Sequence, residues 1–401
     1  MRAGLDVVTI EFESAGLIEE LEDPEGFAWV HHGEGLVAWG EAVRLEVEPG
    51  TDRFERATKA LTETFSTFGV EDEVRVPGSG PVAFGAFTFD PREPGSVVVI
   101  PSIVIGRSNG RSWITRIGPG SKIDRSEASE DDRIRYWGPS ASEVAWLDAV
   151  ATAEKAVRNK EIEKVVLARD MRVWSKTALS PRRLVKRLAG RFPECYSFSV
   201  DGLIGATPEL LVRTEGKQVS SLILAGSIRR GSDEAEDALL GRRLLGSAKD
   251  AVEHEIAVRS VTDLWPRFCE TLTVAASPQL LKLANVQHLA TEIQGEMRNA
   301  HSALEIAGTL HPTAAVCGLP RPKAMDMIRD LEGMSRARYA GPVGWVDARG
   351  NGEWGIALRC AEIDGGSARL FAGAGIVEGS TPEGELDETR LKLLAMQSAL
   401  G

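Results

Sequence analysis

Short apolar runs separated by glycine, proline and polar turn residues recur along the first 118 positions of the chain. Runs such as GFAWV, VAFGAFTF and SVVVIPSIVI have the length and the β-branched and aromatic content of strands. No chemical motif accompanies them. The polar stretch 118–136 is predicted to be a long loop or junction, because it combines turn-forming residues with no hydrophobic period.

Helical and strand-like patterns alternate through the rest of the chain. Apolar residues at helical spacing from about residue 142 lead into an apolar run that predicts a strand over 164–173. Further helices are predicted at 180–193, 233–246 and 250–265. The remaining apolar runs predict long strands, with an NG hairpin signal between two of them. Long antiparallel strands interrupted by helices predict an α+β fold with a large layered sheet.

The stretch 373–392 reads GAGIVEGSTPEGELDETRLK and leads into a predicted helix. Its spacing, G-x-G-x-x-x-G outside any βαβ unit, does not fit a dinucleotide-binding loop. Thr381 is a good N-cap and Pro382 fits the first helical position, while Gly375 and Gly379 allow a sharp entry. We therefore expect a helix that begins after Thr381.

That helix brings Glu385, Glu388 and Lys392 to one face, at the edge of its buried surface. The charges fit a binding site, but they equally fit a solvated acidic first turn that the helix dipole favours. This stretch alone leaves both interpretations open.

Composition and charge narrow the function. The chain has 401 residues, 43% of them hydrophobic, and a formal net charge of −12, which argues against nucleic-acid or anionic-membrane binding. No C-x-x-C pair occurs among the cysteines, so neither a disulfide framework nor a zinc knuckle is indicated. The N-terminus lacks a signal-peptide core and no apolar run approaches membrane-spanning length. We expect a cytoplasmic enzyme that acts as a monomer on a small molecule.

A second source of carboxylates lies in the predicted helix at 249–265. Glu253 falls on the apolar stripe of this helix, which includes Ile256 and Ala257, whereas Glu255 points elsewhere. A buried carboxylate is costly unless it is paired or bound to a metal. Glu253 and Glu388 together could hold a Mg²⁺ ion that keeps waters and is completed by an anionic substrate. A salt bridge from Glu253 to an arginine explains the pattern equally well.

Several other residues could carry chemistry, although each signal is weak alone. Lys164 opens an apolar strand, where most lysines are solvated, but burial would disfavour its charged form and suit a base. Glu209 resembles an ordinary strand-edge residue, and burial would suit it to a general acid. Arg359 lies among apolar neighbours and could clamp a carboxylate. His288 and His311 are more often core histidines than catalytic ones.

Together, these residues lie in segments that resemble chorismate-utilising enzymes, in the family's order. The segments are KVVLAR, GATPELLVR, LAGSIRRG, KDAVEHEIAV, VQHLAT, HPTAAV, YAGPVGWVDARGNGEWGIALRC and FAGAGIVEGSTPEGELDET. The resemblance is highly specific and covers residues 137–401, and within the family the chain is similar to isochorismate synthases of the menaquinone or catechol-siderophore type. It implies a variable N-terminal part of the same fold, 1–135, and a chorismate-binding catalytic region, 136–401.

The resemblance also implies two α/β subdomains around antiparallel sheets and a Mg²⁺-dependent reaction on chorismate. Lys164 matches the base that activates water for attack at C2, and Glu209 matches the acid that protonates the departing C4 hydroxyl. Glu253 and Glu388 match the metal ligands, with Glu385 in the shell around them. The positions that match substrate contacts, or that lie beside the substrate, are Gly226, Ser227, His288, Ala315, Arg359, Gly373 and Lys392.

Relatives with other products fit less well. Anthranilate synthases lack the lysine of KVVLAR, and aminodeoxychorismate synthases typically carry PIKGT where this chain has LILAGS. Salicylate synthase, which goes on to eliminate pyruvate, is the main alternative, and its type has threonine at the position of Ala315 where isochorismate synthases have alanine. An inactive chorismate- or Mg²⁺-binding homologue is a third reading, and the intact set of predicted catalytic residues argues against it.

Overall fold

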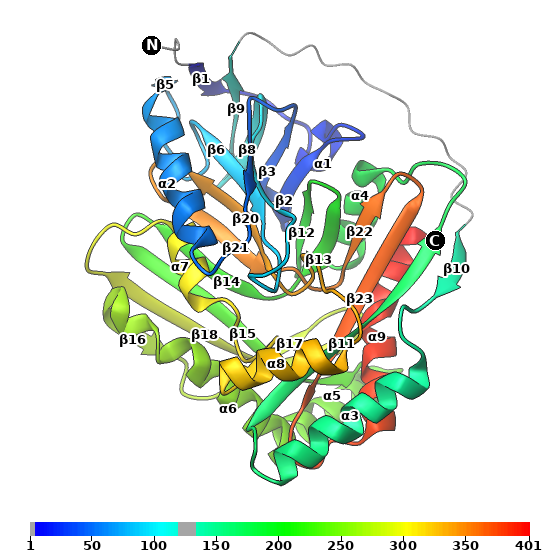
Figure 1. Cartoon of the computed structure of the whole chain (residues 1–401). Coiled ribbons are helices and arrows are strands. Elements are labelled where there is room, and N and C mark those ends of the chain that lie inside the picture. Colours follow the sequence, from blue (N-terminus) through cyan, green and yellow to red (C-terminus); the bar gives the residue numbers. More distant parts are fainter. Residues whose placement is uncertain (1–4, 119–133) are drawn as a thin grey trace.

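The computed structural model describes residues 5–118 and 134–401, so most of the loop predicted at 118–136 lies outside the described residues. Within the described residues the strands form two large sheets, one of 13 strands and one of ten (Figure 1). Buried side chains of both sheets meet in one hydrophobic core, to which Trp29, Phe84 and Trp354 contribute. The predicted α+β fold is confirmed.

The strands of each sheet follow one another as below, in order of pairing. The larger sheet contains β10 (Arg135–Gly138), β11 (Lys164–Trp174), β23 (Ser367–Ile376), β22 (Cys360–Asp364), β13 (Leu203–Thr207), β12 (Tyr196–Val200), β2 (Phe27–His31), β3 (Glu34–Trp39), β8 (Ile103–Ser108), β9 (Arg111–Ile117), β1 (Asp6–Glu11) and β5 (Gly69–Asp72), with β19 (Gly318–Leu319) on β11. The smaller sheet contains β16 (Cys269–Val274), β18 (Val286–Met297), β15 (Gln218–Arg229), β14 (Leu210–Glu215), β21 (Gly352–Ile356), β20 (Pro342–Asp347), β6 (Val82–Ala86), β7 (Ser96–Ile100) and β4 (Val43–Val47), with β17 (Gln279–Lys282) on β18.

Residues up to 118 belong to the same two sheets as the rest of the chain. β2 pairs antiparallel with β12, and β6 pairs antiparallel with β20. Figure 1 shows the blue N-terminal strands continuing beside green and orange ones from later in the sequence. The early strands therefore complete the layers against which the later strands pack.

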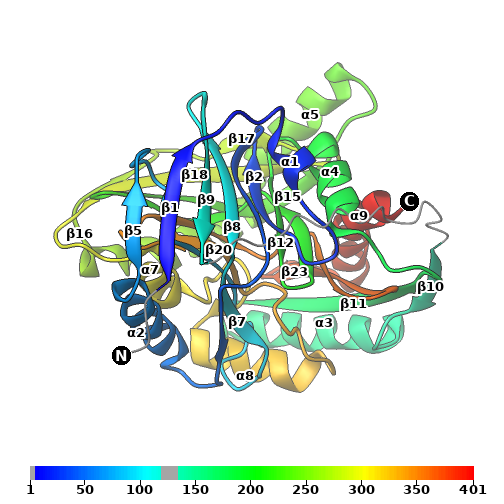
Figure 2. The same ribbon diagram turned by 90° about the horizontal axis from the view of Figure 1, so that it is seen from above.

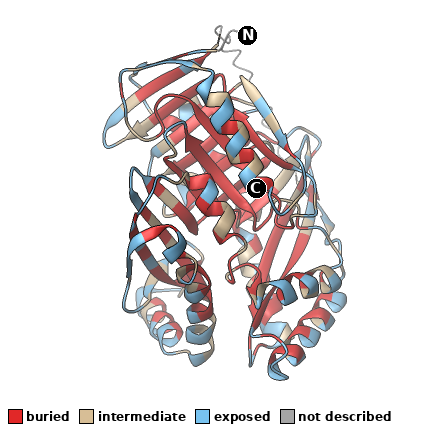
Figure 3. Ribbon diagram, turned by 60° about the vertical axis from the view of Figure 1, so that its left-hand side comes forward, coloured by how far each residue is buried: buried red, intermediate tan, exposed pale blue. Residues whose placement is uncertain are grey.

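Helices cover the outer faces of the sheets (Figure 2). They are α1 (Leu17–Glu20), α2 (Arg53–Ser66), α3 (Glu143–Arg158), α4 (Pro181–Arg191), α5 (Glu234–Leu245), α6 (Ala248–Thr262), α7 (Ala303–Leu310), α8 (Arg321–Leu331) and α9 (Pro382–Leu400). α9 and α3 pack on β23, and α6 packs on β15. Figure 3 shows their exposed outer faces over strands that are largely buried. No helix in the described residues is long and apolar enough to cross a membrane.

The cap signals in the sequence are confirmed. The side chain of Ser180 caps α4, Ser247 caps α6, and Thr381 accepts from the Gly384 amide at 3.3 Å to cap α9. The role predicted for Gly375 is wrong, because this residue lies inside β23 rather than in the turn before α9. Gly379, with a φ of 88°, provides that turn.

Two predicted continuous strands are broken where the chain passes from one sheet to the other. The run LIGATPELLVRT splits into β13 of the larger sheet and β14 of the smaller, with Glu209 at the crossing. The run through IALRC splits into β21 and β22, with Arg359 at the crossing in a left-handed conformation, φ 45°. The two crossings are joined by hydrogen bonds, since the Ile356 amide donates to the Glu209 carbonyl and the Ala206 amide donates to the Arg359 carbonyl, both at 3.2 Å.

Candidate active site

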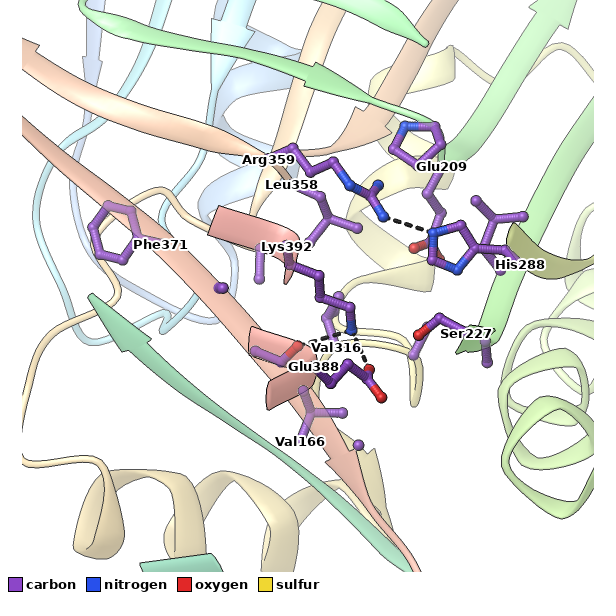
Figure 4. Close-up of a pocket in the computed structure, with 18 of the residues that line it drawn as sticks. Val166, Glu209, Ser227, His288, Val316, Leu358, Arg359, Phe371, Glu388 and Lys392 are labelled. Carbon is purple, nitrogen blue, oxygen red and sulfur yellow. Dashed lines mark hydrogen bonds and ion pairs between the residues drawn. The ribbon is translucent and has the colours of Figure 1, made fainter. Parts of the chain in front are cut away.

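A pocket lies at these crossings, between the two sheets, α6, α9 and the segment after α7 (Figure 4). Among the predicted site residues, its lining contains Glu209, Gly226, Ser227, Glu253, His288, Ala315, Arg359, Gly373, Glu388 and Lys392. Lys164 and Glu385 do not line it. The sequence prediction therefore gathers residues from well-separated segments into one site, with two members lying just outside it.

Glu209 is buried in the wall of the pocket. Its side chain belongs to a residue only 2% exposed, and its Oε1 atom has no hydrogen-bond partner. Burial raises its pKa to about 8, and the charges of Lys164, Arg359 and Lys392 offset only part of that effect. Glu209 is therefore mostly protonated at neutral pH and can donate a proton into the pocket. The sequence alone suggested an ordinary strand-edge residue.

Arg359 and His288 form a cationic wall. Nη2 of Arg359 donates to Nε2 of His288 at 2.6 Å, and Nδ1 of His288 faces the Gly226 carbonyl at 3.3 Å. This arrangement assigns the proton of the neutral ring to Nδ1. Burial and the charges of Arg359 and Lys392 hold the pKa of His288 well below its usual value. The imidazole thus stays neutral and orients the guanidinium, whose Nε has no partner.

Lys392 and Glu388 form the pair that the helix spacing predicts. Nζ of Lys392 lies 2.6 Å from Oε1 of Glu388 and donates to the Gly373 carbonyl at 2.9 Å (Figure 4). Burial alone would raise the pKa of Glu388, but Lys392 outweighs it and keeps the pKa below its usual value, with the Ser227 hydroxyl contributing. Both side chains are half-buried. The pocket therefore has an ionised carboxylate and an ammonium side by side.

Lys164 and Glu253 form a second pair behind Gly375. Lys164 is completely buried, and its Nζ lies 3.1 Å from Oε1 of Glu253. A Cβ atom added to Gly375 would lie 2.2 Å from that oxygen and 3.0 Å from Cε of Lys164. Gly375 therefore lets both side chains approach the strand. The salt bridge expected as the alternative for Glu253 exists, but with a lysine rather than an arginine.

Glu385 turns away from the pocket. Its Oε1 lies 2.6 Å from Nζ of Lys249 on α6, and burial, followed by the charge of Glu388, raises the pKa of its carboxyl. Lys249 and its neighbour Asp250 were missed by sequence reasoning. The helical period of α6 places Asp250 one turn before Glu253, which is the signal that could have found it.

The donors in the pocket fit a magnesium ion. No group of three or more His, Cys, Asp or Glu side chains is arranged as a metal site in the described residues. Mg²⁺, however, is commonly held by one or two carboxylates plus waters and substrate oxygens. Glu253 and Glu388 both line the pocket and offer only oxygen ligands, so the chemistry of the donor set suits Mg²⁺ better than zinc or copper.

An apolar wall faces the charged groups. Tyr339 stacks on Phe371 with ring centroids 5.1 Å apart, and Leu358, Val316 and Ala315 continue the lining. Burial raises the pKa of Tyr339, so its hydroxyl stays protonated. Sequence reasoning missed the first four of these residues, because apolar residues in strands and loops have no signal that separates a ligand pocket from a core.

Similar proteins point to one family. A family model described as chorismate binding enzyme matches residues 120–401. The isochorismate synthase MenF of Bacillus subtilis is 34% identical over 381 residues, which cover 87% of this chain and 80% of that protein. The isochorismate synthase EntC of Escherichia coli strain K12 is 37% identical over 328 residues, which cover 80% of this chain and 81% of that protein.

A solved structure agrees. DhbC of Bacillus anthracis, a protein assigned as a 2,3-dihydroxybenzoate-specific isochorismate synthase, superposes with a TM-score of 0.81 at 31% identity, covering 96% of this chain and 98% of the other. This likeness spans both sheets rather than the matched C-terminal region alone. The chain belongs to the family of chorismate-binding enzymes, and the relatives that it resembles along most of its length are isochorismate synthases.

Proposed function

We propose that the protein is an isochorismate synthase, which converts chorismate to isochorismate by adding water at C2 with loss of the C4 hydroxyl. The observation that carries this proposal is Glu209, a buried carboxyl that retains its proton at neutral pH and lines a pocket with Arg359 and Lys392. Departure of a hydroxyl from C4 requires a proton donor at that oxygen. Few carboxyl groups in a protein are protonated at pH 7 without such burial.

Lys164 and Glu209 divide the proton transfers. Lys164, as the neutral amine, takes a proton from the attacking water while the C2–O bond forms and the ring double bonds shift. Glu209 gives its proton to the C4 oxygen as the C4–O bond breaks, and that oxygen leaves as water. One water enters and one leaves, so the reaction is a net isomerisation. The proton on Lys164 and the vacancy on Glu209 are restored by exchange with solvent.

Arg359 and Lys392 neutralise a dianionic substrate. Chorismate carries two carboxylates, and a protein with a net charge of −12 can bind it only where the local field is positive. The Arg359 guanidinium, held by His288 at 2.6 Å, can pair with one carboxylate bidentately. Lys392, already anchored on the Gly373 carbonyl, can contact the other.

Glu253 and Glu388 are the residues that would hold Mg²⁺. When bound, this ion supplies positive charge that fixes a substrate carboxylate and lowers the repulsion between anions. The two carboxylates enter the pocket from different helices, α6 and α9, so both helices must be in place. Gly375 leaves the space in which Glu253 lies.

Incubation of the purified protein with chorismate and Mg²⁺, followed by identification of the products, tests this function. We expect isochorismate in a reversible mixture with chorismate. Salicylate with pyruvate would identify a salicylate synthase, and unchanged chorismate would identify an inactive homologue. The apolar Ala315 in the lining favours the first outcome, because its methyl group offers no hydrogen bond that could orient the side chain of the substrate for elimination.

A further inference from the structure

A second cavity, of about 490 Å³, is bordered by α2, α7 and α8 and shares no lining residue with the catalytic pocket. Part of its wall is apolar and comes from Phe54, Pro91, Pro312, Pro322 and Met325. Its volume lies within the range of about 300–1,000 Å³ that small-molecule sites occupy. The remaining wall is strongly basic, and this combination indicates a ligand with an apolar and an anionic part.

Three of the four arginines in the wall have no counter-ion. Arg329 is compensated, because it lies 2.6 Å from Asp90 and 2.9 Å from Asp326. Arg53, Arg92 and Arg321 also line the cavity, and none of them makes an ion pair within the part of the chain that the structure describes. This positive excess stands in a protein of net charge −12.

Arg53 is the most constrained of the three. It is only 3% exposed, donates to the Thr88 carbonyl at 3.1 Å and the Gly50 carbonyl at 3.4 Å, and has no partner for Nε. Burial lowers the pKa of Arg53 to about 10, and the charge of Asp90 offsets only part of this effect. A buried guanidinium with an open donor is favourable only where an anion can approach it.

Two helices direct their positive ends to the same cavity. Arg53 is the first residue of α2, and Arg321 is the first residue of α8. A cation at a helix N-terminus is unfavourable, whereas an anion there is stabilised by the helix dipole. Arg321 is held in place by the C-terminus of α7, since it donates to the Leu310 carbonyl at 3.2 Å and the His311 carbonyl at 3.4 Å.

We propose that this cavity binds a small organic carboxylate with an apolar body. Arg53, Arg92 and Arg321 pair with the carboxylate, and the body packs on Phe54 and Met325. Arg53 and Arg321 are already oriented by backbone carbonyls, so little side-chain entropy is lost when the ligand binds.

The cavity adjoins the catalytic pocket through one short segment. His311 and Pro312 line the cavity, whereas Ala315 and Val316 line the catalytic pocket. Nε2 of His311 donates to the Phe89 carbonyl at 3.0 Å, and the Phe89 ring lies under the guanidinium of Arg336, 4.2 Å away. Arg336 in turn donates to the Val316 carbonyl at 2.8 Å. Occupancy of the cavity is therefore linked to the KM for substrate, and the linkage of the two binding equilibria is reciprocal.

Titration calorimetry with benzoate as the probe tests the site independently of turnover. We expect one saturable site, which Arg92→Ala and Arg321→Gln each weaken by about tenfold or more. Arg158→Gln, which removes an exposed positive charge on α3, should leave benzoate binding unchanged. Arg359→Gln should also leave it unchanged, because Arg359 belongs to the catalytic pocket.

Steady-state measurements test the linkage. Benzoate should change the KM for chorismate in the wild type and in Arg158→Gln, and this change should disappear in Arg92→Ala. No saturable binding, or binding lost in Arg359→Gln and retained in the two cavity variants, would overturn the site. Binding of inorganic phosphate in place of benzoate would overturn the ligand class. Benzoate binding with an unchanged KM would contradict the linkage.

Discussion

Nζ of Lys164 lies 3.1 Å from Oε1 of Glu253, so the predicted base and one predicted metal ligand form a single buried ion pair. The second predicted ligand, Glu388, is paired in the same way with Lys392 at 2.6 Å. A divalent cation at these carboxylates would share them with the two lysines. Its charge would disfavour the ammonium form of Lys164, so metal binding and readiness of the base are expected to be coupled.

Removal of either carboxylate tests the metal hypothesis. Glu253→Gln and Glu388→Gln should abolish Mg²⁺-dependent turnover, because each substitution removes a charged oxygen ligand while nearly keeping the shape of the side chain. Glu255→Gln on α6 and Glu383→Gln on α9 are matched controls, since both residues are exposed and lie outside the pocket. Product formation with and without EDTA measures the effect. Full activity of the wild type in chelator would refute a metal role.

Gly375→Ala tests whether the close approach of the Lys164–Glu253 pair to β23 is needed. The added methyl would lie 2.2 Å from the Glu253 carboxylate and must displace it. We expect a large loss of kcat with the fold retained. Gly190→Ala on α4 is the control, because a methyl there meets no atom within 4 Å. A Gly375→Ala enzyme with wild-type kcat would show that the position of this pair is unimportant.

Lys164→Ala and Glu209→Ala should each slow the reaction by roughly 10²–10⁴-fold, the usual value of one proton-transfer group. Chorismate binding should survive in both, because Arg359 and Lys392 remain. Single-turnover kinetics with a separate binding titration distinguishes these effects. If Lys164→Ala reacted at near the wild-type rate, water activation would belong to another group.

Glu209 also sets an expected pH dependence. Its pKa is raised to about 8 and the protonated form is the active one, so kcat/KM should fall as the pH rises through about 8. Below that pH the acid stays protonated and this group causes no loss. Glu209→Gln should be slow at every pH and should lack this alkaline limb. A limb that persists unchanged in the slow variant would assign it to another residue.

Ala315→Thr tests the choice of product. A threonine hydroxyl could orient the enolpyruvyl side chain for elimination, and one hydrogen bond of about 1 kcal/mol shifts the partitioning several-fold. We expect less isochorismate and a larger pyruvate-releasing fraction, measured by a coupled pyruvate assay beside a melting curve. Overpacking alone would lower the melting temperature without any gain in pyruvate, and that result would make Ala315 merely a small core residue.

Local signals in the sequence predicted much of the fold. Ser180, Ser247 and Thr381 mark helix starts, because a cap needs only a side-chain oxygen near the first amides. The crossings at Glu209 and Arg359 were missed, since a strand that enters another sheet stays buried and keeps its apolar pattern. Positive φ at Arg359 was likewise invisible, because tertiary contacts hold a conformation that its residue type disfavours.

The site was predicted mainly through the family resemblance. Apolar spacing alone marked Glu253 as facing the core, and the partner of that carboxylate, Lys164, could not be read from spacing because it comes from a distant strand. The burial that raises the pKa of Glu209 depends on both sheets closing over it. Tyr339 and Phe371 meet only in the folded chain.

The most direct measurement is the fate of labelled water. We expect isochorismate formed from chorismate and Mg²⁺ in H₂¹⁸O to carry the label at C2, since the account requires solvent water to attack that carbon and the C4 oxygen to leave. Glu253→Gln should give no labelled isochorismate under the same conditions. Isochorismate without ¹⁸O would contradict the account, because the hydroxyl would then have moved within the substrate.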